Sequence, residues 1–384
     1  MSNTEKLHCP VQKKCGGCQT LNLSYKQQLS KKMADVIALM GKFCHVDEIH
    51  GMSDPTHYRN KVQSAFGFVN GKQINGMYQS SSHKIVQTDA CLLEDEICGE
   101  VVRTVAKIVK QQKISIYDPR TGRGTLRHLL VRRGKQTGEI MVVPVTSTPL
   151  FPQAKRFTEA LLKERPDVTT VVQCINDTSI FLWMGEREKV LYGKGYIEDI
   201  LCGKRFRISP KSFYQINPVQ TEFLYSKAIE FASPSPDTVL LDAYCGIGTM
   251  GIIAADKAKT VIGVESNREA VKDATVNAKI NGIKNIRFYC EDAGEMMKKM
   301  AYGNERIDTV ITDPPRAGCS REFLDSCITL APPRIVYVSC NPETLARDCA
   351  YLTKHGYKVK KVIPVDMFPH TAHCECVCLI EKNK

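Results

Sequence analysis

The feature that most constrains the fold of this chain is a regular alternation of short apolar segments and helical patterns after about residue 203. Five segments are short, apolar and followed by turn residues, which is typical of buried strands: Val239–Asp242, Thr260–Glu265, Ile286–Cys290, Thr309–Thr312 and Arg334–Ser339. Patterns with helical spacing follow them near residues 249–257, 267–281, 293–301, 320–330 and 342–355. This alternation predicts an α/β fold with a parallel, doubly wound sheet.

The remaining strand patterns lie at the end of the chain and in its first half. The segments Lys358–Val365 and Glu375–Glu381 are joined too closely for a crossover helix, so we expect the final strand to be antiparallel. Residues near 58 to 145 are rich in strand patterns, with a hairpin expected where Ala65–Val69 turns at Asn70-Gly71. A helix with one apolar face is expected over Ser24–Met40.

Charge and cysteine content limit the class of protein. The formal net charge of +12 favours a polyanionic partner. The N-terminal residues are polar and no apolar run could span a bilayer, so we expect no membrane partner and a cytoplasmic location. Thiols stay reduced there, and the 17 cysteines are therefore interpreted as metal ligands, a nucleophile or core residues rather than as disulfides.

Glycines and carboxylates follow the predicted parallel strands and indicate a cofactor site. Gly246 and Gly248 stand between a strand and a helix, where the backbone can approach a ligand closely. Glu265 ends the next strand and suits ribose hydroxyls, Asp292 could take an adenine amino group, and Asp313 could face the amino acid end of a ligand. Asp292 could equally be a helix N-cap. The glycine spacing is not G-x-G-x-x-G, so the set fits S-adenosylmethionine better than NAD.

Cys340 follows the predicted strand Arg334–Ser339 and precedes Asn341-Pro342. A cysteine at this edge of the sheet, beside a cofactor site, indicates a thiol nucleophile. A helix that starts at Pro342 is expected to lower the thiol pKa. A lone cysteine in such a place is otherwise most often a small buried apolar residue.

Two further groups of cysteines could hold a metal. Cys9, Cys15 and Cys18 have the spacing C-x5-C-x2-C, and Cys91 or Cys98 could complete a set of four. Four thiolates suit zinc and a [4Fe–4S] cluster equally well. Cys374, Cys376 and Cys378 alternate along the final strand, where a buried apolar face is favoured over a metal site.

Several motifs occur together in one order along nearly the whole chain. They are Cys9, Cys15, Cys18 and Cys91; Phe213–Pro218; Asp242–Gly248; Asp313–Arg316; Ser339–Pro342; and Phe368–Glu375. In these motifs the chain resembles the RNA uracil-C5 methyltransferase family, in the branch that carries an iron–sulfur cluster and includes enzymes of 23S ribosomal RNA.

The resemblance implies three structural parts. They are an iron–sulfur segment over residues 1–55 and about 85–100, a central β-rich domain over residues 56–200, and a Rossmann-like class I methyltransferase domain over residues 201–384. Many members carry an RNA-binding β-barrel before the cluster motif, whereas this chain begins at that motif. We therefore expect RNA contacts from the cluster segment, the β-rich domain and the mouth of the catalytic site.

The resemblance also implies a role for individual residues. Cys340 would be the nucleophile and Glu375 the base. The residues implied to bind S-adenosylmethionine are Gln215, Tyr244, Glu265, Asp313, Thr249 and Asp292. The ligands implied for a [4Fe–4S] cluster are Cys9, Cys15, Cys18 and Cys91, with Cys91 preferred to Cys98 because family members carry a cysteine at this place.

The implied function is transfer of a methyl group from S-adenosylmethionine to C5 of a specific uridine in RNA through a covalent Cys–C6 adduct. The cluster motif favours ribosomal RNA, since the transfer-RNA branch of the family generally lacks it. A monomer is expected. The alternatives are a C5-pyrimidine methyltransferase of transfer RNA or DNA, and a non-catalytic RNA-binding or assembly protein; intact Cys340 and Glu375 argue against the last.

Overall fold

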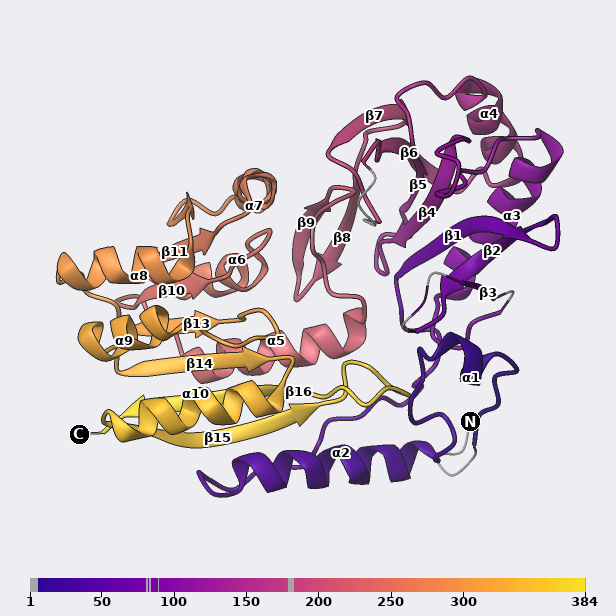
Figure 1. Cartoon of the computed structure of the whole chain (residues 1–384). Helices are drawn as coiled ribbons and strands as arrows, with labels where there is room; N and C mark the ends of the chain where they lie inside the picture. The colour runs from indigo at the N-terminus through magenta and orange to yellow at the C-terminus, as the bar shows by residue number, and fades with distance from the viewer. Residues whose placement is uncertain (1–5, 81, 83, 89, 179–182, 384) are drawn as a thin grey trace.

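The computed structural model describes residues 6–80, 82, 84–88, 90–178 and 183–383. Two large sheets lie at opposite ends of the molecule, and a two-stranded ribbon lies between them (Figure 1). The ribbon consists of β8 (Ile197–Leu201) and β9 (Lys204–Ile208). One hydrophobic core runs from the N-terminal sheet through the ribbon to the C-terminal sheet, with Val143, Phe206 and Leu240 as members. The parts therefore share a continuous apolar interior.

The C-terminal sheet has, among the residues described, seven strands in the order β12-β11-β10-β13-β14-β16-β15. Their bounds are β10 Val239–Ala243, β11 Thr260–Glu265, β12 Ile286–Cys290, β13 Thr309–Thr312, β14 Arg334–Ser339, β15 Tyr357–Val365 and β16 Glu375–Lys382. The pairs among β10 to β14 are parallel. The last strand, β16, is antiparallel to both β14 and β15, which confirms the expectation from the short connection.

Helices cover both faces of this sheet, as the alternating pattern predicts. The helices are α5 Pro218–Ala232, α6 Thr249–Ala255, α7 Arg268–Ile280, α8 Ala293–Tyr302, α9 Arg321–Leu330 and α10 Pro342–Lys354. Leu224 of α5 and Ile252 of α6 pack into one core, whereas Met297 of α8 and Leu345 of α10 pack into a second core on the other face. The fold is Rossmann-like, and the carboxyl ends of its parallel strands meet at one edge.

The N-terminal sheet also has seven strands within the described ranges, in the order β3-β2-β1-β4-β5-β6-β7. Their bounds are β1 Lys61–Val69, β2 Lys72–Tyr78, β3 Ile85–Gln87, β4 Leu126–Arg133, β5 Ile140–Thr146, β6 Val168–Ile175 and β7 Arg187–Tyr192. The predicted hairpin is confirmed: Asn70 and Gly71 both have positive φ, at 50° and 73°, as a tight turn between twisted strands requires. Helices α3 (Glu96–Gln111) and α4 (Ala154–Glu164) pack on one face.

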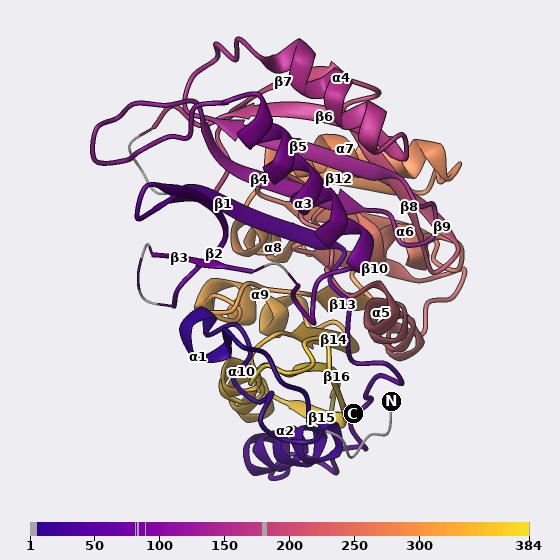
Figure 2. The ribbon, with the colours of Figure 1, turned by 90° about the vertical axis from the view of Figure 1, so that its right-hand side faces the viewer.

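Helix α2 (Tyr25–Met40) of the N-terminal segment packs on the C-terminal sheet, which follows much later in the sequence. Helix α1 (Gln12–Cys15) precedes α2, which packs against α10 and β15 (Figure 2). The side chain of Ser24 caps α2 by accepting a hydrogen bond from the Gln27 N–H, and the Gln27 side chain accepts one from the Ser24 N–H. No helix in the described part of the chain combines the length and apolarity needed to cross a membrane.

Candidate active site

The turn between β10 and α6 provides an open backbone cradle. Tyr244, Gly246 and Gly248 all have positive φ, at 61°, 56° and 81°. A Cβ built on Gly248 would lie 2.8 Å from the Phe288 ring, whereas one on Gly246 would meet nothing within 4 Å. Gly248 therefore serves close packing, and Gly246 faces free space before the N-terminus of α6. The turn therefore leaves room for a ligand to approach its backbone closely.

A cavity lies beside this turn, at the carboxyl edge of the sheet. Four of the predicted cofactor residues line it: Gln215, Tyr244, Thr249 and Asp313. Sequence reasoning gave no role to Phe213 and Tyr225, which also line it. The buried Tyr225 hydroxyl has hydrogen-bond contact with Thr249 and Gln215, and therefore ties two of the predicted residues together. Residues of α5 and α6 line the same cavity only in the folded chain, so the role of Tyr225 could not be predicted from the sequence.

Glu265 and Asp292 use part of their hydrogen-bonding capacity within the protein. Glu265 Oε2 accepts a hydrogen bond from the Gly246 N–H at 3.1 Å. Asp292 is the N-cap of α8, and its Oδ1 accepts from the N–H groups of Gly294 and Glu295. The expectation that Asp292 could be a helix N-cap is therefore confirmed. Asp292 also lies near Tyr244, whose pKa is raised mainly by burial and further by Cys319 and Asp292.

Two carboxylates lie at the strand ends, Asp242 buried and Asp313 half-buried. Burial raises the pKa of Asp313 to about 7. Burial likewise raises the pKa of Asp242 to about 7, although its Oδ2 accepts a hydrogen bond from the Gly251 N–H at 2.7 Å. The other oxygen of Asp242 is buried without a hydrogen-bond partner among the described residues. Since Asp313 lines the cavity, a cationic ligand placed there would restore its charge, and this fits the sulfonium and ammonium groups of S-adenosylmethionine.

Cys340 and Glu375 lie on neighbouring strands. Ser339 at the end of β14 pairs with Cys376 of β16, so the next residue of the first strand, Cys340, comes beside Glu375. Burial raises the pKa of Glu375 well above its usual range, and Asp313 and Cys374 add to the rise. The strand-end thiol of Cys340 thus lies near the carboxyl group of Glu375. Because the pKa of this carboxyl group is raised, its ionised form is a strong proton acceptor.

The expectation of a low pKa for Cys340 is wrong. Asn341 caps α10 directly after Cys340, as predicted. Even so, burial raises the pKa of Cys340, and the charges of Glu375 and Asp313 raise it further, while Arg316 lowers it. Burial first, and then two carboxylates from other strand ends, raise the pKa of this thiol despite the adjacent helix N-terminus.

The cysteines of the last strand belong to the core. Cys374, Cys376 and Cys378 are all buried and lie in one hydrophobic cluster with Cys349. Their packing agrees with the apolar interpretation favoured from the sequence.

The N-terminal cysteines lie close to one another. Burial raises the pKa of Cys18 to about 12, and Cys91, Cys15 and Cys9, in that order, contribute further electrostatic repulsion. Cys98 instead lies in the core beneath the N-terminal sheet. Across the described ranges, no group of three or more His, Cys, Asp or Glu side chains has a geometry that could hold a metal ion. The four thiols are thus neighbours, although they are not arranged in the geometry of a metal site.

Comparisons with known proteins extend this description. The family described as tRNA (Uracil-5-)-methyltransferase matches residues 184–383. An uncharacterized RNA methyltransferase of Oceanobacillus iheyensis is 45% identical over 94% of this chain and 80% of its own length. One of Halalkalibacterium halodurans is 43% identical over 97% of this chain and 82% of its own length.

A solved structure resembles the whole chain. It is the Pyrococcus abyssi tRNA (uracil-54, C5)-methyltransferase in complex with S-adenosyl-L-homocysteine, with a TM-score of 0.79 and 29% sequence identity. The similarity covers 97% of this chain and 87% of that one. Both sheets and the segment that joins them are therefore part of the shared architecture.

Proposed function

The chain belongs to the RNA uracil-C5 methyltransferase family and is an S-adenosylmethionine-dependent enzyme, and from this premise we propose that Cys340 and Glu375 carry its chemistry. The observation that supports this assignment is their adjacency across the ends of β14 and β16, near half-buried Asp313. A nucleophile and a base are needed on one uracil ring, and the adjacent strands supply one of each.

The reaction needs both groups because C5 of uracil is a poor nucleophile. Addition of the Cys340 thiolate to C6 forms a Sγ–C6 bond and leaves electron density at C5. Bound S-adenosylmethionine supplies the methyl group, which C5 accepts. The Glu375 carboxylate then takes the C5 proton, the C5–C6 double bond returns, and the Sγ–C6 bond breaks to release the thiolate. A uridine in a helix or stack must leave it to reach such a site.

We assign cofactor binding to Gln215, Tyr244, Glu265, Asp313, Thr249 and Asp292. Four of these line the cavity beside the glycine turn, and Glu265 contacts the turn itself. Asp313 would complement the positive end of the cofactor, and Glu265 retains acceptor capacity for ribose hydroxyls. Asp292 would contact the adenine end through the oxygen that does not cap α8.

We further propose that Cys9, Cys15, Cys18 and Cys91 hold a [4Fe–4S] cluster. Four thiols are the donor type that such a group takes. Cys91, Cys15 and Cys9 lie close enough to Cys18 to add to the burial that raises its pKa, and a cation between the thiols would offset this repulsion. Zinc is the alternative for the same donors. In this proposal residues 1–55 and about 85–100 form the cluster segment, residues 56–200 the β-rich domain, and residues 201–384 the methyltransferase domain.

For the substrate we propose ribosomal RNA, on the resemblance of the cysteine motif to the cluster-bearing branch. Transfer RNA is the second candidate, and it is favoured by the similarity to the tRNA (Uracil-5-)-methyltransferase family and to the Pyrococcus abyssi tRNA (uracil-54, C5)-methyltransferase. Mapping of 5-methyluridine in both RNA pools of a deletion strain distinguishes them. Loss from ribosomal RNA supports the first, loss from transfer RNA the second, and unchanged 5-methyluridine in both contradicts the proposed function.

Substitution of the nucleophile tests the chemistry. Cys340→Ala should abolish methyl transfer to RNA from the deletion strain and any adduct that resists denaturation, because the variant lacks the thiol that would add to C6. Cofactor binding should persist. Cys44→Ala, a half-buried thiol elsewhere in the chain, is the matched control and should retain activity. Methyl transfer by the Cys340 variant would exclude the covalent route.

A further inference from the structure

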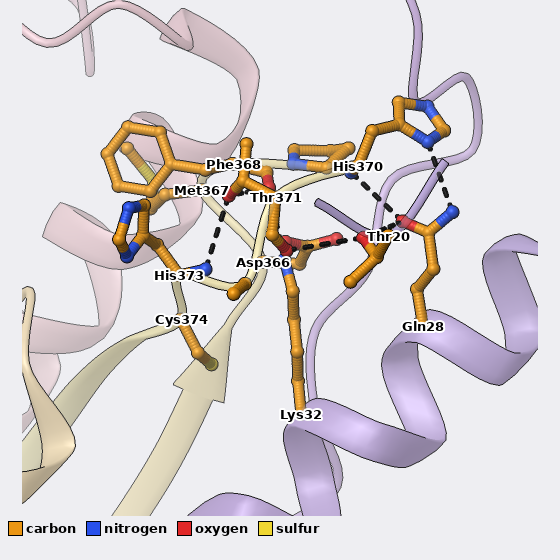
Figure 3. Close-up of polar contacts among 12 residues, drawn as sticks. Thr20, Gln28, Lys32, Asp366, Met367, Phe368, His370, Thr371, His373 and Cys374 are labelled. Atoms are coloured by element: carbon orange, nitrogen blue, oxygen red, sulfur yellow. Dashed lines mark hydrogen bonds and ion pairs between the residues drawn. The ribbon is translucent and has the colours of Figure 1, made fainter. Parts of the chain in front are cut away.

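The segment that leads into Glu375 is held in one conformation by other parts of the molecule. This base loop, residues 366–374, joins β15 to β16 (Figure 3). Asp366 and Met367 are fully buried, and His370 is 2% exposed. His370 also has a φ of 68°, a left-handed conformation that costs free energy in a residue with a Cβ. Such a conformation persists only where surrounding contacts enforce it.

The contacts come from outside the loop. Its successive carbonyl oxygens, from Asp366 to His370, each accept a hydrogen bond from another element. The donors, in order, are Gln220 Nε2 at 3.0 Å, Asn217 Nδ2 at 3.0 Å, Lys32 Nζ at 3.0 Å, the Tyr58 hydroxyl at 3.1 Å and the Thr20 N–H at 3.1 Å. Such a series fixes the path of the backbone up to the strand that carries Glu375.

Helix α2 supplies the charged anchor. Lys32 Nζ lies 2.6 Å from Asp366 Oδ1, and the two side chains are 3% and 0% exposed. The Tyr25 hydroxyl donates to Asp366 Oδ2 at 2.8 Å. A buried ion pair gains little stability over an apolar pair, whereas loss of one partner leaves an unpaired buried charge. Its value here lies in the geometry it imposes on the start of the base loop.

One turn earlier on α2, Gln28 holds the strained residue. Gln28 Oε1 accepts a hydrogen bond from the His370 N–H at 2.9 Å, and Gln28 Nε2 lies 3.1 Å from His370 Nδ1. Figure 3 shows Gln28 and Lys32 reaching the loop from the same side of the helix. The far end of the loop approaches the nucleophile's surroundings, since His373 Nδ1 is 3.3 Å from Arg316 Nη2.

We propose that Lys32 and Gln28 are positioning residues for the catalytic base: they hold the base loop so that the Glu375 carboxylate meets the C5 proton of the methylated adduct. The inference rests on the proposed role of Glu375. In this proposal α2, which lies more than 330 residues before the base loop in sequence, contributes to proton removal. It does not contribute to thiol addition or to methyl transfer.

The proposal predicts a change in the balance between two steps. In the variants Lys32→Met/Asp366→Asn and Gln28→Leu, methyl transfer should continue while proton removal lags. The double substitution leaves no unpaired charge, and Met retains the apolar stem. Enzyme that is folded but has a displaced base would then accumulate as a methylated RNA adduct, at least tenfold above the wild-type level.

The experiment compares tritium release with methyl transfer in one turnover. The probe is ribosomal and transfer RNA from the deletion strain, labelled with tritium at uracil C5. Wild-type enzyme and Lys31→Met, which removes a lysine that is exposed together with its partner Asp35, should release one tritium per methyl group. The variants should release fewer at early times and show the adduct on denaturing gels.

The outcomes separate the proposal from a purely structural role and from the proposed function. Loss of folded protein would lower both signals equally, so a ratio of one in the active fraction of Gln28→Leu or of the double variant overturns the inference. If Glu375→Gln itself releases one tritium per methyl group, the proposed role of Glu375 fails instead.

Discussion

At Asp313, burial raises the pKa of a carboxyl group that lines the cavity beside the glycine turn. With a pKa of about 7, this carboxyl group is mostly protonated below pH 7 and mostly ionised above it. A cationic ligand binds the ionised form, so affinity should increase as pH rises through 7. Asp242 and Glu375 are the other carboxyl groups at this edge whose pKa is raised, and the Asp313 variant isolates its contribution.

We therefore predict that the affinity for S-adenosylmethionine rises between pH 6 and pH 8, by at most about tenfold per unit below the pKa. Asp313→Asn should weaken binding at pH 8 and flatten this dependence. Calorimetric titration at several pH values measures both. S-adenosylhomocysteine, which lacks the sulfonium charge, should show a shallower profile, and an equally steep profile for the Asp313 variant would contradict the assignment.

The residue types at the site were largely predictable, whereas their electrostatics were not. Gly246, Asp313 and Cys340 follow strands, and this position alone predicts the edge at which they meet. The pKa of Cys340 depends on Glu375 and Asp313, which approach it only through the order of β13, β14 and β16. A rule that considers the neighbouring helix N-terminus alone gives the wrong direction.

At the scale of single elements, local signals were sufficient where periodicity is strong. The helices of the C-terminal sheet and the hairpin of β1 and β2 follow from apolar spacing and from Asn70-Gly71. The docking of α2 on β15 and α10 could not be predicted, because Lys32 on this helix gives no sign in sequence of its partner Asp366. Lysine side chains are rarely buried unless they are paired with an acidic group, so the burial of Lys32 is understood only once Asp366 is known to contact it.

The cysteine segment carries a prediction about metal content. Protein purified without air should contain about four irons per chain, because four thiolates would ligate the cluster. Serine substitution of Cys9, Cys15, Cys18 or Cys91 should each remove iron. The α1 segment should also become more susceptible to proteolysis, since ligation would supply much of its folding free energy.

The matched control is Cys98→Ala, a change in the core of the N-terminal sheet that should leave iron bound. Elemental analysis decides between the metals. Zinc at one equivalent in anaerobic protein would contradict the iron–sulfur assignment, and iron retained after substitution of Cys91 would contradict the fourth ligand.

At the scale of the whole molecule, the two sheets are joined through a continuous hydrophobic core. The chain as a whole is basic, which favours binding to a polyanion. The α/β class of the C-terminal half was predictable because each parallel strand there, from β10 to β14, is followed by its own helix. The order of the N-terminal sheet was not, since its pairs join strands as distant as β1 and β4. Such pairings depend on packing between layers rather than on local pattern.

The net charge of +12 predicts a strong salt dependence of RNA binding. Affinity for RNA should fall by at least about tenfold between 50 and 200 mM salt, because contacts with phosphates release counterions. Affinity for S-adenosylmethionine should change much less over the same range. Filter binding and calorimetry measure the two, and RNA affinity independent of salt would contradict a binding mode based on phosphate contacts.

The most direct test of the central claim is peptide mapping of the Glu375→Gln variant after reaction with RNA and S-adenosylmethionine. The C5 proton cannot leave in this variant, so the intermediate should persist through denaturation. After nuclease and protease digestion, mass spectrometry should find a methylated uridine nucleotide on the peptide that contains Cys340. Binding of RNA and S-adenosylmethionine without any adduct, or an adduct on another cysteine, would contradict the account.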